Sequence, residues 1–230
     1  MKELKQITVS TDLCDLKFVD ISTSRTLEYV IEDLFEKDEY GFKSLNFLPG
    51  DVVVDIGANV GVVSIYLAKK YPDIQVYSFE AHPINYKNLL QNIELNNVSN
   101  IKPFNLAVSS TDEQFVSITL AQNNSGSSSL FIVDPKDPLT ATIKTISLDS
   151  IIRINSIEKI NFLKLDCEGS EFDILENSKL IHEILIENIS AEIHTYMQSK
   201  NKNVDSLVEL INNVSKNKPN CKLYTLGYIQ

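Results

Sequence analysis

The sequence predicts an α/β fold built on an open, mostly parallel sheet with helices on both faces. Short apolar, β-branched runs alternate along the chain with segments in which apolar residues recur at helical spacing. Three of the strand-like runs end in an acidic residue, at Asp55, Glu80 and Asp166. Because the carboxyl ends of parallel strands form one edge of such a sheet, where ligands bind, we expect a binding site at these acids.

The first 48 residues precede this pattern and are interpreted as an N-terminal extension. Residues 7–21 have the composition of strands, and the apolar residues between positions 27 and 35 recur at helical spacing. Pro49 and Gly50 then separate this part from a domain that we expect to cover residues 49–230. The extension at residues 1–48 could line the substrate entrance or act as a structural cap, and both interpretations stay open.

Residues 51–64 read DVVVDIGANVGVVS and form the segment around which the domain is organised. The apolar run at residues 52–54 is typical of a strand buried on both faces. Gly57 and Gly61 follow, and from Val62 onward the apolar residues suit a helix packed on a sheet. Such a glycine turn lets a ligand approach the backbone, and the helix N-terminus supplies N–H groups and a partial positive charge.

Asp55 indicates which ligand suits this turn. A dinucleotide-binding turn reads G-x-G-x-x-G, and Asp55 stands where that motif has its first glycine. A carboxylate is a poor neighbour for a diphosphate, but it can hold an ammonium group while the helix N-terminus meets a carboxylate. S-adenosylmethionine (SAM) carries both groups, so we expect SAM as the cofactor. An NAD(P)-dependent oxidoreductase on the same architecture is the alternative.

The second strand supports an adenosyl ligand of either kind. Residues 75–79 form a strand that ends at Glu80, and an acid at this place can accept both ribose hydroxyls. We expect His82 to pack on the adenine or the ribose. Asn105, after the third strand, could offer its amide to the adenine base or simply form a turn.

The second half of the chain contains further strands and one long polar connection. Residues 113–120 and 141–148 alternate like strands. The serine-rich segment between them, residues 121–139, is interpreted as a mobile lid over the site or as a plain hairpin loop. A strand at residues 184–193 follows, and we expect the last strand at residues 221–229.

Strand ends in this half carry the candidate catalytic residues. Methyl transfer is an in-line displacement, so the protein must position both reactants and accept a proton from a hydroxyl acceptor. We predict Asp166, Glu168 and His194 for these tasks, with His194 as a base near neutral pH or as a structural histidine at a strand end. Asp166, Glu192 and His194 could also hold a divalent cation, but they are dispersed along the chain, so we expect no metal site. Ser170 matches the start of a capping box for the next helix.

Composition argues against several classes of function. The net charge is −10, and only Arg25 and Arg153 are arginines, so we expect no nucleic-acid partner. No apolar run approaches ~18 residues, so we expect no membrane span. We expect no signal peptide, and three cysteines without metal-ligand spacing suit a reducing compartment. The sequence therefore predicts a cytoplasmic protein and leaves its oligomeric state open.

Several stretches together resemble the FkbM family of SAM-dependent methyltransferases. They read VVVDIGANVGVVS, FEAHPINYKNLLQNIELN, NLAVS, GSSSL, ISLDSI, NFLKLDCEGSEFDIL and AEIH, and they cover about residues 50–195. The resemblance implies a class I, Rossmann-like methyltransferase fold with a mostly parallel seven-stranded sheet, SAM as donor, and O-methylation of a small-molecule or sugar hydroxyl. It implies a site role for Asp166 and Glu168, while residues 1–48 and the tail lie outside it.

With these motifs, the full set of predicted cofactor contacts is Asp55, Gly57, Ala58, Asn59, Gly61, Glu80, His82, Asn105, Ala107 and Asp166. A SAM-binding module that has lost its activity and serves as a partner surface is a further alternative. The presence of both Asp166 and Glu168 argues against that alternative.

Overall fold

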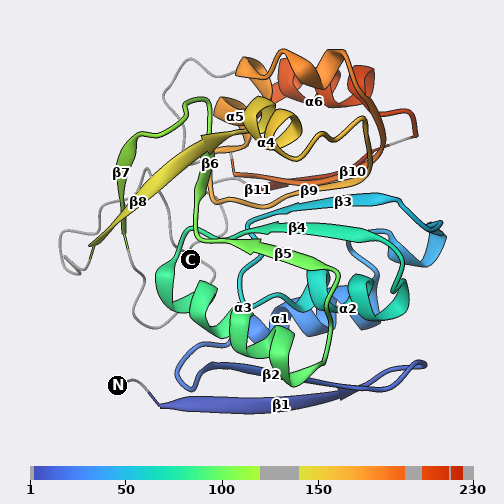
Figure 1. Cartoon of the computed structure of the whole chain (residues 1–230), viewed down its shortest axis with the longest axis vertical. Coiled ribbons are helices and arrows are strands. Elements are labelled where there is room, and N and C mark those ends of the chain that lie inside the picture. Colours follow the sequence, from blue (N-terminus) through green and yellow to red (C-terminus); the bar gives the residue numbers. More distant parts are fainter. Residues whose placement is uncertain (1–2, 120–139, 195–203, 218, 225–230) are drawn as a thin grey trace.

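The computed structural model describes residues 3–119, 140–194, 204–217 and 219–224. A six-stranded, all-parallel sheet lies at its centre with helices on both faces, which confirms the predicted α/β class (Figure 1). The strands lie in the order β11, β10, β9, β3, β4, β5. Their bounds are Val52–Ile56 (β3), Gln75–Phe79 (β4), Ile101–Phe104 (β5), Lys159–Leu165 (β9), Leu185–His194 (β10) and Asn220–Tyr224 (β11).

Within the described ranges this sheet has one strand fewer than the seven expected. The last described strand, β11, ends at Tyr224, and the remainder of the strand predicted at residues 221–229 lies outside those ranges. The chain runs outward from β3 to β5 on one side and from β9 to β11 on the other, so the strand order reverses between β3 and β9. Ligands of open α/β sheets bind in the crevice at such a switch point.

Each central strand faces a hydrophobic core on both sides. Val53 and Val54 are adjacent and fully buried, yet they belong to different cores, as do Phe162 and Leu163 in the neighbouring strand β9. Successive side chains of a strand point to opposite faces, which explains why these runs are continuously apolar. One face is covered by α2 (Val62–Lys70) and α3 (Pro83–Leu95), and the other by α4 (Leu148–Ile154), α5 (Glu171–Asn177) and α6 (Val204–Val214) (Figure 1).

The N-terminal segment forms a hairpin and a helix beside α3. The hairpin consists of β1 (Leu4–Ser10) and β2 (Asp15–Ile21), and the helix α1 (Thr26–Ile31) continues into the π-helical turn η1 (Glu32–Lys37) and, after a loop, the short helix η2 (Phe42–Ser44). On α3, Asn92 exchanges hydrogen bonds with the backbone of Val19 (2.7 and 3.1 Å), and Asn96 does the same with Lys17 (2.9 and 2.7 Å).

These two amides satisfy the outer edge of β2, which would otherwise expose unpaired backbone groups. Phe18 and Leu27 share one hydrophobic core with Val53 of the central sheet. The domain boundary between residues 48 and 49 stays a prediction.

A second, smaller sheet extends beyond β5. It consists of β6 (Ala107–Ser109), β8 (Thr140–Ser147) and β7 (Phe115–Thr119), with β8 in the middle. The two strands predicted at residues 113–120 and 141–148 are thereby confirmed. The serine-rich segment that we interpreted as a lid or a hairpin loop lies outside the described residues.

Ser170 precedes α5 but does not cap it in the predicted way. Its backbone is helical (φ −81°, ψ −5°) and its side chain makes no capping hydrogen bond, because a capping side chain requires an extended backbone at that residue. Glu171 fixes the start of α5 instead, accepting the N–H groups of Cys167 (3.0 Å) and Gly169 (3.1 Å). The expected capping box is therefore wrong.

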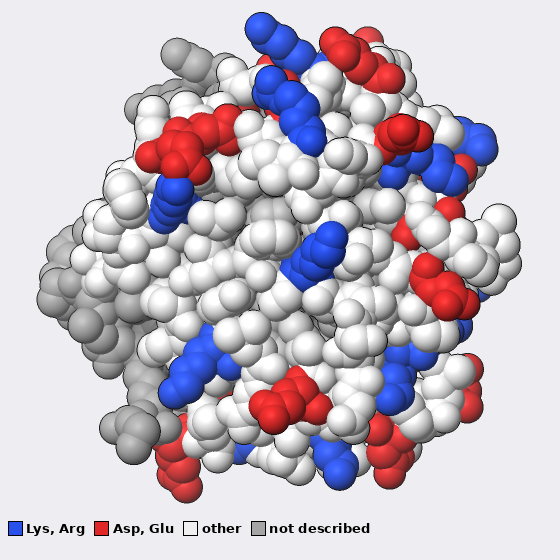
Figure 2. All heavy atoms as spheres, in the orientation of Figure 1, with Lys and Arg blue, Asp and Glu red and all other residues white. Residues whose placement is uncertain are grey.

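The surface carries charges of both signs. On the face shown in Figure 2, basic and acidic side chains are interspersed and do not form the basic stripe that nucleic acid would require. None of the helices in the described ranges combines the length and the hydrophobicity needed to cross a bilayer.

Candidate functional site

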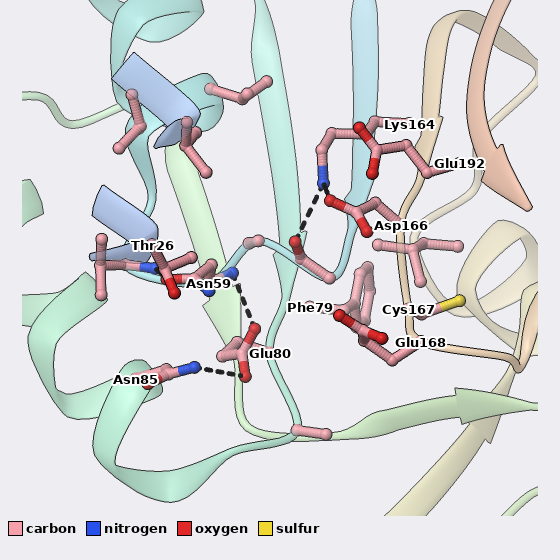
Figure 3. A pocket seen from close by; sticks show the side chains of 18 of the residues that line it. Thr26, Asn59, Phe79, Glu80, Asn85, Lys164, Asp166, Cys167, Glu168 and Glu192 are labelled. Carbon is pink, nitrogen blue, oxygen red and sulfur yellow. Dashed lines mark hydrogen bonds and ion pairs between the residues drawn. The ribbon is translucent and has the colours of Figure 1, made fainter. Parts of the chain in front are cut away.

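A cavity of about 250 Å³ opens at the carboxyl ends of β3, β4 and β9, beside the switch point of the sheet (Figure 3). Its volume lies near the lower end of the roughly 300–1,000 Å³ typical of small-molecule sites. Its walls come from the glycine turn after β3, the tip of β4, the tips of β9 and β10, and the N-terminal helix. Of the predicted site residues, those that line it are Gly57, Ala58, Asn59, Glu80, Ala107, Asp166 and Glu168.

Gly57 is the point at which the glycine turn meets the end of β9. Its φ is +80°, and an added Cβ would lie 1.7 Å from the carbonyl oxygen of Asp166. The N–H groups of Gly57 and Ala58 both donate to the carbonyl of Phe79 at 3.0 Å. The neighbouring backbone therefore excludes any side chain at position 57, independently of a ligand.

Glu80 is buried at the tip of β4 and lines the cavity. One carboxylate oxygen accepts the N–H of Asn59 (2.7 Å) and the other accepts the N–H of His82 (2.8 Å), as Figure 3 shows for Asn59. Burial raises the pKa of Glu80 to about 7, against the two backbone hydrogen bonds, which lower it. The oxygen that accepts from His82 also accepts a long hydrogen bond from the amide of Asn85 (3.5 Å), whereas the oxygen that accepts from Asn59 keeps a second lone pair for a ligand hydroxyl.

Lys164 was missing from the predicted site, yet it connects the predicted residues. It lies on β9 with a side chain that is 3% exposed. Its Nζ donates to the carbonyl of Gly57 (3.0 Å) and lies 3.4 Å from Asp55 Oδ1 and 3.3 Å from Asp166 Oδ2 (Figure 3). Burial opposes its charge, but Asp166 and Asp55 outweigh burial and raise the pKa of Lys164 well above its ordinary value. A lysine inside the apolar run NFLKLD of a central strand was the available signal.

Asp55 lies behind the cavity and is not among the residues that line it. It is fully buried, its Oδ2 accepts the hydroxyl of Ser64 (2.6 Å), and its Oδ1 faces Lys164. The carboxylate of Asp55 is thus turned toward Ser64 and Lys164, and its expected hold on a ligand ammonium, directly or through a water, stays a prediction. Asp55 contacts Lys164, which in turn lines the cavity, because both residues are buried at the ends of paired strands.

Three further predicted contacts have structural roles. The buried His82 accepts two N–H groups in the first turn of α3 (3.1 and 3.3 Å) and so caps that helix. Asn105 donates its amide to the carbonyls of Glu80 (2.8 Å) and Ala81 (3.1 Å). At Gly61, with φ +90°, an added Cβ would meet a side-chain carbon of α3 at 2.3 Å. None of the three is among the cavity-lining residues, and their assignment as cofactor contacts stays a prediction.

The tips of β9 and β10 form an acidic rim in which Asp166, Glu168 and Glu192 line the cavity. His194 is buried beside them, with Nδ1 3.0 Å from a carboxylate oxygen of Glu171 and Nε2 3.7 Å from one of Glu168. Burial opposes its charge, but the hydrogen bond and charge of Glu171 outweigh burial and raise the pKa of His194 to about 9. A pKa of about 9 favours the imidazolium at neutral pH, which argues against His194 as a base near pH 7 and agrees with the alternative, a structural histidine at a strand end.

The sheet also brings Asp166, Glu192 and His194 together. Their ligand atoms lie within 4.8 Å of one another because β9 and β10 are paired parallel strands. Carboxylate and imidazole donors at this spacing suit a divalent cation, so the premise that these residues are dispersed was wrong. The absence of a metal site remains a prediction.

The N-terminal segment supplies a wall of the cavity that the motifs did not reveal. Thr26, Tyr29, Val30 and Asp33 of α1 and η1 line it. The ring of Tyr40 lies against Lys164, with Nζ 5.8 Å from the ring centroid. Of the two open interpretations of the extension, lining of the entrance is thus supported. Helical spacing indicated this helix but could not indicate which distant cavity its residues would meet.

Comparison with known proteins relates this site to one enzyme family. Residues 55–217 match the methyltransferase FkbM domain. "Methyltransferase 1" of Beauveria bassiana is 25% identical over 186 residues, which are 73% of each chain. "Hexuronic acid methyltransferase AglP" of Haloferax volcanii is 29% identical over 128 residues, which are 55% of this chain and 49% of that protein. "31-O-demethyl-FK506 methyltransferase FkbM" of Streptomyces tacrolimicus is 29% identical over 65 residues, which are 28% and 25% of the two chains.

Among solved structures, M. jannaschii TYW2 in complex with AdoMet overlaps 43% of this chain, with 29% identity and a TM-score of 0.32. The overlap spans 42% of the TYW2 chain, and a TM-score this low is too weak to locate a site. The family match covers well over half of the sequence and includes the glycine turn, Glu80 and the tips of β9 and β10. The chain therefore belongs to the FkbM methyltransferase family and is a SAM-dependent methyltransferase.

Proposed function

We propose that this protein transfers the methyl group of SAM to a hydroxyl oxygen of a small molecule or sugar. The observation that carries the proposal is that Glu80 and Asp166 line one cavity on either side of the Gly57 turn, at the switch point of the sheet. The names of two relatives, which mention a hexuronic acid and 31-O-demethyl-FK506, also support a small acceptor. The free thiols of Cys14, Cys167 and Cys221 suit a reducing compartment, so a cytoplasmic location remains our prediction.

The cavity has a group for each part of the cofactor. Glu80 accepts the two ribose hydroxyls, one on the oxygen that is bonded only to the N–H of Asn59 and the other in place of the long hydrogen bond from the Asn85 amide. Apolar side chains from Phe79, Leu106 and Ile118 form the wall beside it, where an adenine ring would pack. Val62 and Val63 open α2 at the cavity, and the N–H groups of a first helical turn suit a carboxylate. When bound, SAM supplies an electrophilic methyl group on a sulfonium.

The acidic rim serves the acceptor. Asp166 and Glu168 line the cavity, and we assign them to orient the acceptor hydroxyl and take up its proton. His194 acts through these groups, because its imidazolium is held between Glu171 and Glu168 and does not itself line the cavity. Lys164 fixes Asp166 relative to the Gly57 turn, so that the two reactants are held in a set relation.

Ligand-dependent melting and methyl transfer test the proposed function. S-adenosylhomocysteine should raise the Tm of the protein and NAD⁺ should not, since only the former has an amino acid end for the α2 terminus. Methyl-labelled SAM incubated with small-molecule extracts of the source organism should yield a labelled product that resists mild base, as an ether does. Stabilisation by NAD⁺ alone would contradict the proposal. Tight SAM binding with no labelled product would favour an inactive SAM-binding module.

Glu80→Gln should weaken SAM binding and remove a pH dependence. The ionised carboxylate is the better acceptor for two hydroxyls, and its pKa is about 7, so wild-type affinity should fall as the pH drops from 8 to 6. The variant should bind about 10–100-fold more weakly at pH 8, because a charged hydrogen bond contributes roughly 1.5–3 kcal/mol. Titration calorimetry at several pH values measures both effects. An affinity of the variant equal to that of the wild type at pH 8 would show that Glu80 does not hold the ribose.

Lys164→Met should destabilise the fold because it leaves the buried Asp55 without its cation. Breaking a buried ion pair from one side costs about 3–5 kcal/mol of unfolding free energy. The double variant Lys164→Met/Asp55→Asn removes the unpaired charge and should recover at least about half of that loss. Urea unfolding measures each value. An additive or greater loss in the double variant would contradict a direct coupling between the two side chains.

A further inference from the structure

The charges that line the cavity restrict the chemistry of the acceptor. In the described part of the chain the acidic side chains at the cavity outnumber the single basic one, Lys164. The acids are Asp33, Glu80, Asp166, Glu168 and Glu192. They come from three separate parts of the fold, namely the N-terminal helix, the tip of β4 and the tips of β9 and β10. Carboxyl groups therefore surround the cavity and are not confined to one rim, although the raised pKa values of Glu80, about 7, and Glu192, about 8, reduce the share that these two contribute to the charge at neutral pH.

Lys164 is not available to an anionic acceptor. Its Nζ donates one hydrogen bond, to the carbonyl of Gly57, and forms ion pairs with one carboxylate oxygen each from Asp55 and Asp166. With 3% of its side chain exposed, it cannot swing out of these contacts without leaving Asp55 unpaired in the interior. Its positive charge balances charges of the protein itself.

From this geometry we infer that the acceptor is a neutral or amine-bearing hydroxyl compound and that carboxylated and phosphorylated acceptors are rejected, in which this chain would differ from the relative named for a hexuronic acid. We also infer that Asp33 helps to set this preference. The inference rests on the proposed function and adds the class of substrate to it. A carboxylate or phosphate placed in this cavity would meet Asp33, Asp166 and Glu168, and in the described part of the chain the one basic residue that lines the cavity is already paired. Like charges of this kind suppress a wrong partner strongly.

Asp33 is the part of this charge that belongs to the N-terminal segment. Its side chain is 22% exposed and forms an ion pair with Lys37 (3.0 Å), and it lines the cavity. Asp33 also acts on the opposite side of the cavity: burial and Asp166 raise the pKa of Glu192 to about 8, Lys164 and His194 oppose this, and Asp33 adds a smaller contribution in the raising direction.

Charge-sorted acceptors test the inference directly. Small molecules extracted from the source organism are separated by ion exchange into anionic, neutral and cationic fractions, and each is incubated with the full chain and methyl-labelled SAM. We expect the label in the neutral or cationic fraction, at least about tenfold above the anionic one. Label mainly in the anionic fraction, with or without added Mg²⁺, would overturn the inference and leave methyl transfer intact. No label in any fraction, from protein that binds S-adenosylhomocysteine, would contradict the proposed function itself.

Two matched variants test whether Asp33 contributes to the rejection of anionic acceptors. Asp33→Asn should raise the ratio of anionic to neutral label about three- to tenfold, because one of the like charges is gone. Glu32→Gln is the control: Glu32 also pairs with Lys37 at 3.0 Å but is not among the residues that line the cavity, so the ratio should not change. Binding of S-adenosylhomocysteine shows that both variants are folded. An equal change in the two variants, or none in Asp33→Asn, would remove Asp33 from the inference.

Discussion

One buried cation holds the site of this methyltransferase together. Lys164 contacts the carbonyl of Gly57 and the carboxylates of Asp55 and Asp166 from a position with almost no exposure. An unpaired ammonium there would cost several kcal/mol, so the three oxygens are what keep it charged. A buried ion pair adds little net stability compared with apolar packing, and its value here is positional. It fixes the glycine turn of β3 and the tip of β9 in one arrangement.

The arrangement of the central sheet determines where Lys164 lies. The strand order reverses between β3 and β9, and Lys164 joins the two strands at this switch point, where open α/β sheets leave a crevice for ligands. Adjacent residues of each strand face different cores, which leaves little freedom for the strands to shift. The N-terminal hairpin is tied to α3 by Asn92 and Asn96, and its helix then closes the cavity from the side.

Much of the fold could be predicted because each strand and helix is indicated by the pattern of neighbouring residues in the sequence. The β-branched run at residues 52–54, the period of the helices and the acids at strand ends follow from the sequence itself, and Gly57, Glu80 and Asp166 were found in this way. The errors concern side chains whose partners are distant in the chain. Lys164, Tyr40 and Asp33 reach the site only in the folded chain, where distant segments come together. The amide of Asn105 donates to a backbone carbonyl, a partner that the sequence did not indicate. The glycine-turn motif correctly marked Asp55 as a residue near the site. It could not show that the carboxylate points to Lys164 and not into the cavity.

The central claim is that the turn fixed by Lys164 places the cofactor between Glu80 and Asp166. The structure of the protein crystallised with S-adenosylhomocysteine tests it most directly. We predict the ribose hydroxyls on the carboxylate of Glu80, the amino acid end between the Gly57 turn and Asp166, and an unbroken contact between Lys164 and the Gly57 carbonyl. A ligand bound away from the Gly57 turn, or a Lys164 side chain that has left Asp55 to contact the ligand, would contradict the account.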